Sequence, residues 1–547
     1  MGMSLALNTL NEATDSSVLE EHARQRHSSH AISPIRDSEG SEDDQDSLHE
    51  LLSNNQILER EGQYIIPRAV ERKKWWRIYF LHFAFMWNTR TFEYVSIILV
   101  ASAFPDDLTA TSIRGIASTL STILFASSVG SWIDKLPDRT RPLYISIMVN
   151  HTSIITIYLA WILWPTIIGD DSRSLKNGFF GLIVLLDVVQ VLSATGNNLS
   201  ISRDWIPVLI GAELGSNYTL THVNAVIARI NLLCKVTSPM ILPFIISAFS
   251  RNTWIFLVTL VTMGVWALEM FCLRIVSMEN AKLLAPKSQE LRSDHLGEML
   301  ATNSIYQVNA WKGVKDLLYH LPAQRLRHFF SMPIWPAAFC MAFLYLTVLV
   351  YSAPLITYLL QSGMSLTAIT TARASGSLMG FVATFTTPMA SGYLNQKWTE
   401  SQTSKGIVPR KLSSSGIIGQ FLSLVPVVLV LQHLSPSSSG IVDENKESVS
   451  QASLVTMITL FGFLSLSRFF HWTYELMEQE LEQSEVLTSQ RSTFSGTGQA
   501  ICSCFDLLHW FATIAWGRPE EFKGLATASL CLVGSSAIWF WVWAQRL

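Results

Sequence analysis

The sequence predicts an all-α polytopic membrane protein with about twelve transmembrane helices in a six-plus-six arrangement. Hydrophobic residues make up 49% of the 547 residues and charged residues only 15%, whereas soluble proteins carry about 25% charged residues. Apolar runs of about 20 residues, the length that crosses ~30 Å of hydrocarbon, recur along the chain. A long polar segment separates these runs into two sets of six.

Residues 1–72 are expected to form a disordered cytoplasmic tail. They are rich in Ser, Glu, Asp, His and Gln and include the acidic run Ser38–Asp46. Such a composition buries too little apolar surface to offset the entropy of ordering. The first apolar run begins near Trp75, too late for a cleavable signal sequence, so insertion is expected to use the first transmembrane helix itself.

The apolar runs place six spans on each side of the polar segment. The first six are expected at 76–103, 109–132, 142–166, 177–202, 222–248 and 253–276. The second six are expected at 333–360, 367–391, 412–433, 453–476, 491–516 and 523–545. We therefore divide this region into an N-terminal half at 73–276, a cytoplasmic linker at 277–332 and a C-terminal half at 333–547. This outline is major-facilitator-like, and in that architecture the solute site lies near the midplane between the halves.

Charge sets the orientation and excludes several classes of function. Lys and Arg are more abundant in the loops on one side, including the linker, which predicts that both termini are cytoplasmic. The net charge of -3 and the lack of a long basic block exclude a nucleic-acid partner. No Gly-x-x-x-x-Gly-Lys loop occurs, so ATP is not expected to drive the protein directly. We expect neither an enzyme nor a cofactor.

The first span carries polar residues on one helical face. His82, Met86 and Glu93 are separated by four and seven residues, and Thr89 lies beside them. Ionisable side chains at membrane depth are costly and usually mark a pathway or a structural pair. Two hypotheses stay open: a mixed ligand face for an ion, or Glu93 paired with a basic residue and His82 at the membrane interface.

The eleventh span carries a second candidate site. Asp506 and His509 are three residues apart, and Cys502 lies one turn earlier on the same side. A carboxylate, an imidazole and a thiolate together suit a divalent transition ion. An ordinary Asp–His hydrogen bond is the alternative.

Two other segments are typical of a transporter. Pro354 interrupts the seventh span, and a broken helix near the midplane is a common place for an ion site, although a simple kink is equally compatible. The segment Gly130–Arg139 places Asp134 four residues after a glycine and is followed by basic residues. It resembles the major-facilitator loop that pairs charges between the halves, which predicts a gating role for Asp134 and Arg139.

Several of these stretches resemble the ferroportin family, solute carrier family 40. The two most specific strings are Arg203-Asp204-Trp205-Ile206 and Asp506-Leu-Leu-His509, and weaker matches extend the resemblance over 76–545. The resemblance implies export of ferrous iron with proton antiport through one metal site in each half. We place Arg203 and Asp204 in the gate with Asp134 and Arg139.

The resemblance also exposes departures at the metal sites that it implies. His509 matches the family histidine of the second site, but Ser352 and Ala353 stand where the family has Asp and Cys. At the first site, Thr89 and Glu93 replace Asp and His. Cys502 is a hypothetical substitute for the lost thiol.

The leading prediction is a monomeric transporter that exports a divalent metal, ferrous iron first, from the cytosol by alternating access, with protons as a coupled partner. Its surroundings are membrane lipid, in the plasma membrane or alternatively the vacuolar membrane. Two other functions stay open: a carrier of a small organic solute, and a non-transporting membrane protein on a transporter scaffold.

Overall fold

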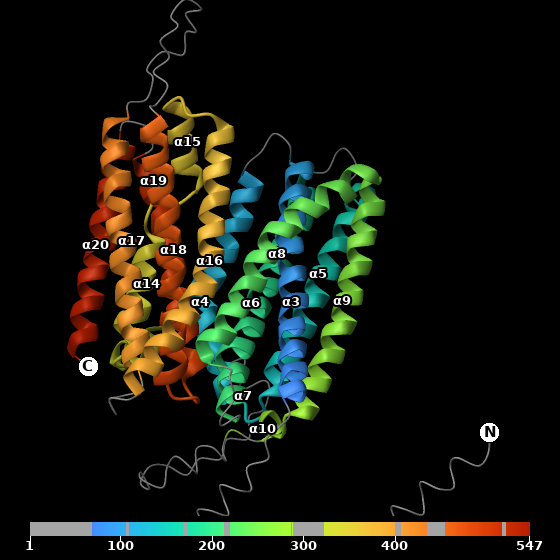
Figure 1. The fold of residues 1–547 in the computed structure, drawn as a ribbon. Coiled ribbons are helices and arrows are strands. Elements are labelled where there is room, and N and C mark those ends of the chain that lie inside the picture. Colours follow the sequence, from blue (N-terminus) through green and yellow to red (C-terminus); the bar gives the residue numbers. More distant parts are fainter. Residues whose placement is uncertain are drawn as a thin grey trace, which may run out of the picture. The chain divides into compact units, whose positions relative to one another are not determined.

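The computed structural model is predominantly helical in the residues that it describes (Figure 1). These residues are 68–104, 109–167, 173–212, 219–285, 287, 322–399, 406–434, 454–516 and 521–546. The unit Arg72–Leu547 is compact, and the architecture below is that of this unit. Most of the predicted tail and most of the predicted linker lie outside the described residues.

The N-terminal half contains six long helical passes, as predicted. They are α3 (Arg68–Ala103), α4 (Thr109–Lys135), α5 (Thr140–Ile167), α6 (Arg173–Leu199), α8 (Leu220–Ala248) and α9 (Arg251–Glu279). The fourth pass is longer than expected because α6 runs without a break into a π-helical turn, η1 (Ser200–Trp205), and then α7 (Ile206–Ala212). A short helix, α10 (Ala281–Leu284), follows α9.

The C-terminal half contains the other six passes, and its first pass is broken. After α13 (Pro322–Ser331), the seventh pass consists of α14 (Trp335–Tyr345) and α15 (Ala353–Gln361), separated by a non-helical stretch. The remaining passes are α16 (Leu366–Thr399), α17 (Ile407–His433), α18 (Leu454–Glu485), α19 (Arg491–Ala515) and α20 (Phe522–Arg546). The predicted end of the tenth span at residue 476 is wrong, since α18 continues to Glu485.

Each half has its own hydrophobic core. One large buried cluster draws all its members from Phe329–Trp543, and two others draw theirs from Phe92–Val258 and Trp75–Leu283. Among the described residues, the cluster that joins the halves is small and has Ala225, Leu476 and Met477 as its fully buried members. The interface between the halves therefore depends largely on polar contacts and close helix packing.

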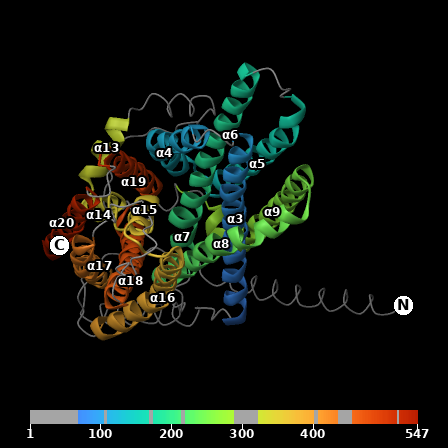
Figure 2. The same ribbon diagram turned by 90° about the horizontal axis from the view of Figure 1, so that it is seen from above.

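The two halves meet along α4, which packs against both α6 and α19, and along α8, which packs against α16 and α18. Viewed from above, α3, α5, α6, α8 and α9 lie on one side, and α14 to α20 lie on the other (Figure 2). This arrangement places α18 and α19 opposite the π-helical turn of the first half.

Seven helices of the described residues are long and apolar enough to cross a membrane by length and composition alone, or eight if the bent pair α13–α14 is one span. The long passes α3, α16, α18 and α19 do not meet this test, although they contain 36, 34, 32 and 25 residues. Three of them, α3, α18 and α19, line the cavity between the halves. Polar residues that line such a cavity lower the mean hydropathy of a span, so composition alone understates the number of spans.

Candidate functional site

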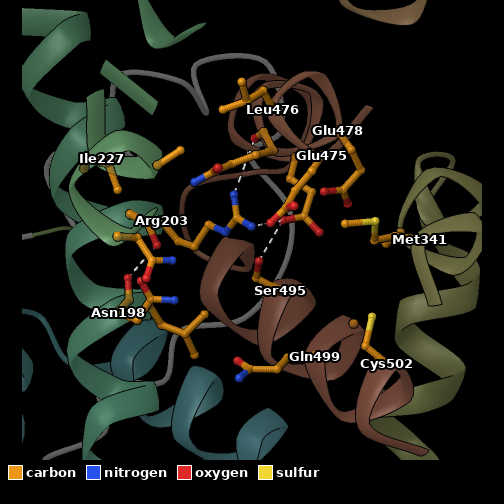
Figure 3. Close-up of a pocket in the computed structure, with 18 of the residues that line it drawn as sticks. Asn198, Arg203, Ile227, Met341, Glu475, Leu476, Glu478, Ser495, Gln499 and Cys502 are labelled. Atoms are coloured by element: carbon orange, nitrogen blue, oxygen red, sulfur yellow. Dashed lines mark hydrogen bonds and ion pairs between the residues drawn. The ribbon is translucent and has the colours of Figure 1, made fainter. Parts of the chain in front are cut away.

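A cavity of about 290 Å³ lies between the two halves (Figure 3). The first half contributes α3, α6, η1 and α8 to its wall, and the second half contributes α14, α18 and α19. The most polar lining residues are His82, Asn198, Ser202, Arg203, Asn231, Glu475, Glu478, Gln479, Glu482, Ser495, Gln499 and Cys502. This position between the halves is where the six-plus-six architecture predicts a solute site.

Three carboxylates from one helix line this cavity. Glu475, Glu478 and Glu482 are spaced by three and four residues, which places them on one face of α18. Glu478 and Glu482 are buried. A cavity with this wall attracts cations and repels anions.

The opposite wall supplies a cation from the π-helical turn. The Nη2 atom of Arg203 lies 2.7 Å from Oε2 of Glu482, and the Ser495 hydroxyl donates to the same carboxylate at 2.7 Å. Arg203 extends from η1 toward the carboxylates of α18 (Figure 3). This ion pair joins the two halves.

Local backbone chemistry explains why the turn around Arg203 can bind the other half. Pro207 has no N–H to donate to the carbonyl of Arg203, four residues earlier. That carbonyl instead accepts from Nη1 of Arg491 on α19 at 3.4 Å. The neighbouring carbonyl of Ser202 accepts from Nε2 of Gln483 at 2.6 Å. Single π-helical turns often mark functional positions for this reason.

Asp134 forms a second connection between the halves. Its carboxylate accepts from the backbone N–H groups of Ser492 at 3.2 Å and Thr493 at 2.6 Å, and from the Thr493 hydroxyl at 2.7 Å. These are the first residues of α19, where the unpaired N–H groups and the helix dipole favour a negative charge. Asp134 thus caps a helix of the opposite half.

Two glycines allow the helices to approach at this point. A Cβ atom on Gly130 would lie 2.1 Å from the carbonyl oxygen of Ser492, and one on Gly496 would lie 2.5 Å from the carbonyl oxygen of Ala126. Either contact would force the backbones apart. The close packing of α4 on α19 therefore requires glycine at both positions.

We call this region, defined by Asp134, Arg203, Asn224, Gln483 and Ser492, the closed end of the cavity. The Asn224 side chain donates to Oε1 of Gln483 at 2.6 Å, which adds another bond between the halves. Bonds from Thr221 to Glu480 and from Arg325 to Ser128 lie in the same region.

Arg139 and Asp204, the other two residues predicted to gate, contact each other rather than the opposite half. The Nε atom of Arg139 lies 3.0 Å from Oδ1 of Asp204, and Nζ of Lys287 lies 2.7 Å from its Oδ2. Lys287 also donates from Nζ to the carbonyl of Ile133 at 2.9 Å. The pair thereby anchors the start of the linker beside the α4–α5 loop.

The first-half ligand candidates do not form a preassembled site. Glu93 is 49% exposed as a side chain and pairs with Arg90 at 2.7 Å. The Thr89 hydroxyl donates to the carbonyl of Phe85 at 3.0 Å. In this state Glu93 therefore has the basic partner that the second hypothesis expected. His82 and Met86 line the cavity between the halves, whereas that hypothesis placed His82 at the membrane interface.

The second-half candidates lie beside the broken helix. His509 is buried, and its Nδ1 atom lies 3.5 Å from the carbonyl of Leu346, in the non-helical stretch after α14. Asp506, one turn away, has no hydrogen bond or ion pair among the described residues. Cys502 lies one turn before Asp506 on α19 and lines the cavity. Across the described residues, no three His, Cys, Asp or Glu side chains are close enough to hold a metal ion.

Sequence reasoning missed Glu478 and Glu482. Both were assigned to the loop after a span predicted to end at residue 476. Their signal was the spacing of Glu475, Glu478 and Glu482, which is helical and continues the face of the preceding span.

Residues 72–533 match the family model described as Ferroportin1 (FPN1). The chain belongs to the ferroportin family. Human ferroportin is 22% identical over 541 residues, with 86% of this chain and 90% of that protein covered. Solute carrier family 40 member 2 of Arabidopsis thaliana is 22% identical over 519 residues, with 91% and 94% covered.

Solved structures support the same fold for this ferroportin-family member. A bacterial homologue of the iron transporter ferroportin, crystallised in an outward-facing state, superposes with a TM-score of 0.67 at 19% identity, over 86% of this chain and all (100%) of that chain. The major-facilitator proton:xylose symporter XylE superposes with a TM-score of 0.55 at 12% identity, over 86% and 96%. The chain is thus a multi-pass membrane protein with the major-facilitator arrangement.

Proposed function

We propose that this ferroportin-family member exports a divalent metal ion, with ferrous iron as the first candidate, from the cytosol by alternating access. The observation that carries the proposal is the cavity between the halves, whose wall bears Glu475, Glu478 and Glu482. Carboxylates in a membrane interior are costly and are retained where they bind or conduct cations. The family assignment and the bacterial iron transporter homologue of the same fold support metal as the cargo.

The distribution of contacts supports alternating access. The Arg203–Glu482 ion pair and the Asp134 cap on α19 close one end of the cavity. Both connections consist of polar groups, which can form hydrogen bonds with water when they separate. The halves can therefore move apart there without exposing a hydrophobic core. We assign Asp134 and Arg203 to the gate itself, and Arg139 and Asp204 to a brace that positions it.

The proposed ligands divide between the halves. His509 and Asp506 would bind the ion beside the non-helical stretch at Leu346, whose carbonyls add oxygen ligands. Glu93 and Thr89 would bind it in the first half once Arg90 moves away, and Cys502 would supply a thiolate between them. Carboxylate, imidazole and thiolate ligands together favour a transition ion over magnesium or calcium.

Radiolabelled iron efflux from intact cells tests this function. We expect wild-type protein to raise efflux above background and His509→Ala to reduce it at least tenfold. His433→Ala changes an exposed histidine at the end of α17 and serves as the matched control. Equal efflux from wild type and His509→Ala would remove the proposed second-half site, and background efflux from wild type would contradict iron export.

A carrier of a small organic solute is the second candidate, favoured by Ser352 and Ala353 at the positions where the resemblance implies metal ligands. Vesicles that contain the protein would support this candidate if they take up a sugar or an organic acid but show no transport of iron.

We further propose a monomer in the plasma membrane, with both termini cytoplasmic and protons as counter-ions. Efflux into the medium tests the location, because a vacuolar carrier would deplete the cytosol without releasing iron from the cell. Terminal epitope tags that react with antibody before permeabilisation would contradict the orientation.

A further inference from the structure

We propose that Glu478 and Glu482 form a docking site for a divalent transition-metal ion at the closed end of the cavity, and that the Arg203 guanidinium occupies this site when that end is closed. The inference rests on the proposed metal transport and adds a position that is separate from the His509 site. Gate and cargo would then compete for the same carboxylates.

Glu478 adds a second buried carboxyl group beside Glu482. Its side chain lines the cavity, is only 6% exposed, and forms no ion pair with a basic side chain of the described residues. Glu482 lies one turn farther along the same face of α18 and pairs with Arg203. One guanidinium therefore faces two buried carboxyl groups, and such a pair is stable only while it shares a proton or holds a cation.

His82 is an independent indication of a ligand. It lines the same cavity from α3, is 1% exposed, and neither of its ring nitrogens has a hydrogen-bond partner in the described structure. A buried polar group without a partner is costly, so this imidazole is free to bind a ligand that enters the cavity. Met86, one turn later, also lines the cavity. An imidazole and a thioether beside carboxylates favour a transition ion.

Occupancy by Arg203 explains why the site is incomplete in this state. The guanidinium binds Glu482 at 2.7 Å, and the Ser495 hydroxyl occupies the same carboxylate oxygen. Departure of Arg203 removes the positive charge that would repel an ion and frees a carboxylate. A divalent ion can then replace it, with water and His82 completing the ligand set.

Competition of this kind links binding to gating. An ion that binds only when Arg203 has left Glu482 stabilises the open form of this end by its differential affinity. By reciprocity, whatever weakens the gate strengthens ion binding. The gate residue and the ion need no other connection, since they share one carboxylate.

Titration calorimetry of the full-length protein in detergent, with Co²⁺ as the probe, tests the site. We expect Glu478→Gln to weaken one class of Co²⁺ site at least tenfold. We expect Arg203→Ala to tighten that class at least threefold, and the double variant Arg203→Ala/Glu478→Gln to lose the gain. Glu485→Gln is the matched control, because Glu485 lies on the same helix but pairs with Arg410 outside the cavity.

The outcomes separate this inference from the proposed function. Unchanged Co²⁺ binding by Glu478→Gln, alongside a loss in His509→Ala, would overturn the docking site and leave metal transport intact. No Co²⁺ binding by wild type would overturn both. Tightening by Arg203→Ala that persists in the double variant would show that Arg203 acts only as a gate. If Glu478→Gln fails to elute as a single species, Glu482→Gln makes the same prediction.

Discussion

Asp204 is a residue whose partners only the structure could identify. The resemblance placed it in the gate, yet its carboxylate lies inside the first half between Arg139 and Lys287. All three side chains are buried. The two positive side chains share this one carboxylate. Without it, Arg139 and Lys287 would repel each other, and the contact that holds the linker against α4 and the α4–α5 loop would weaken.

Asp204→Asn should therefore be strongly destabilising. The change leaves two buried cations without a counter-charge, and breaking such a cluster typically costs about 3–5 kcal/mol. Thermal unfolding of the purified protein measures the loss. Glu279→Gln, which breaks the exposed pair with Arg77, should leave the melting temperature nearly unchanged. Similar melting temperatures for the two variants would contradict the bracing role.

At the scale of elements, the broken seventh pass is the feature that sequence and structure share most closely. Pro354 lies in the first turn of α15, where backbone N–H groups have no partner within the helix. Its missing N–H therefore costs no helical hydrogen bond. The freed backbone before it needs partners, because the surroundings contain little water. The N–H of Val348 donates to the Ser529 hydroxyl of α20 at 3.0 Å, and the N–H of Leu349 donates to Thr347 Oγ1 at 3.2 Å.

Ser529→Ala should destabilise the break. It removes the acceptor of a buried backbone N–H, at a cost of about 1–3 kcal/mol, and should lower the melting temperature. Ser535→Ala is the control, since that hydroxyl is exposed and bonds within its own helix. A stability equal to that of wild type would mean that another group accepts from Val348.

At the scale of the whole molecule, the two cores determine what can move. Each half buries its own apolar cluster, while the halves are joined at the closed end by Asp134, Arg203 and the glycine contacts of α4 with α19. Polar joints between two separately packed halves are suited to repeated opening and closing.

Asp134→Asn should shift the molecule toward opening at this end. The variant loses the charge that stabilises the N-terminus of α19 and one of its acceptor oxygens, a loss of about 1–2 kcal/mol or a five- to thirty-fold change in the equilibrium. Hydrogen exchange of residues 491–497 should become faster. Asp138→Asn, in the same loop, keeps a good helix cap on α5 through Thr140 and should leave that exchange unchanged. Unaltered exchange in Asp134→Asn would exclude it from the gate.

The predictability of the site differs from residue to residue. The family resemblance linked His509 with the broken seventh helix, and in the structure its ring lies near the carbonyl of Leu346 at that break. Its role as a metal ligand stays a prediction. The role of Glu93 could not be predicted from the sequence. The spacing along the helix allows an ion pair with Arg90 and a metal-ligand face equally well. Glu478 and Glu482 were missed because charge at the end of an apolar run resembles a loop.

The sequence by itself determined the number, order and approximate ends of the helices, the division into halves and the family. These follow from apolar length and from motifs that are local in the chain. Only the tertiary structure decided that Arg203 meets Glu482, that Asp134 caps α19, and that His82 lines the same cavity as the α18 carboxylates. Such pairings join residues hundreds of positions apart, and they depend on helix rotation and close approach, which a hydropathy pattern does not encode.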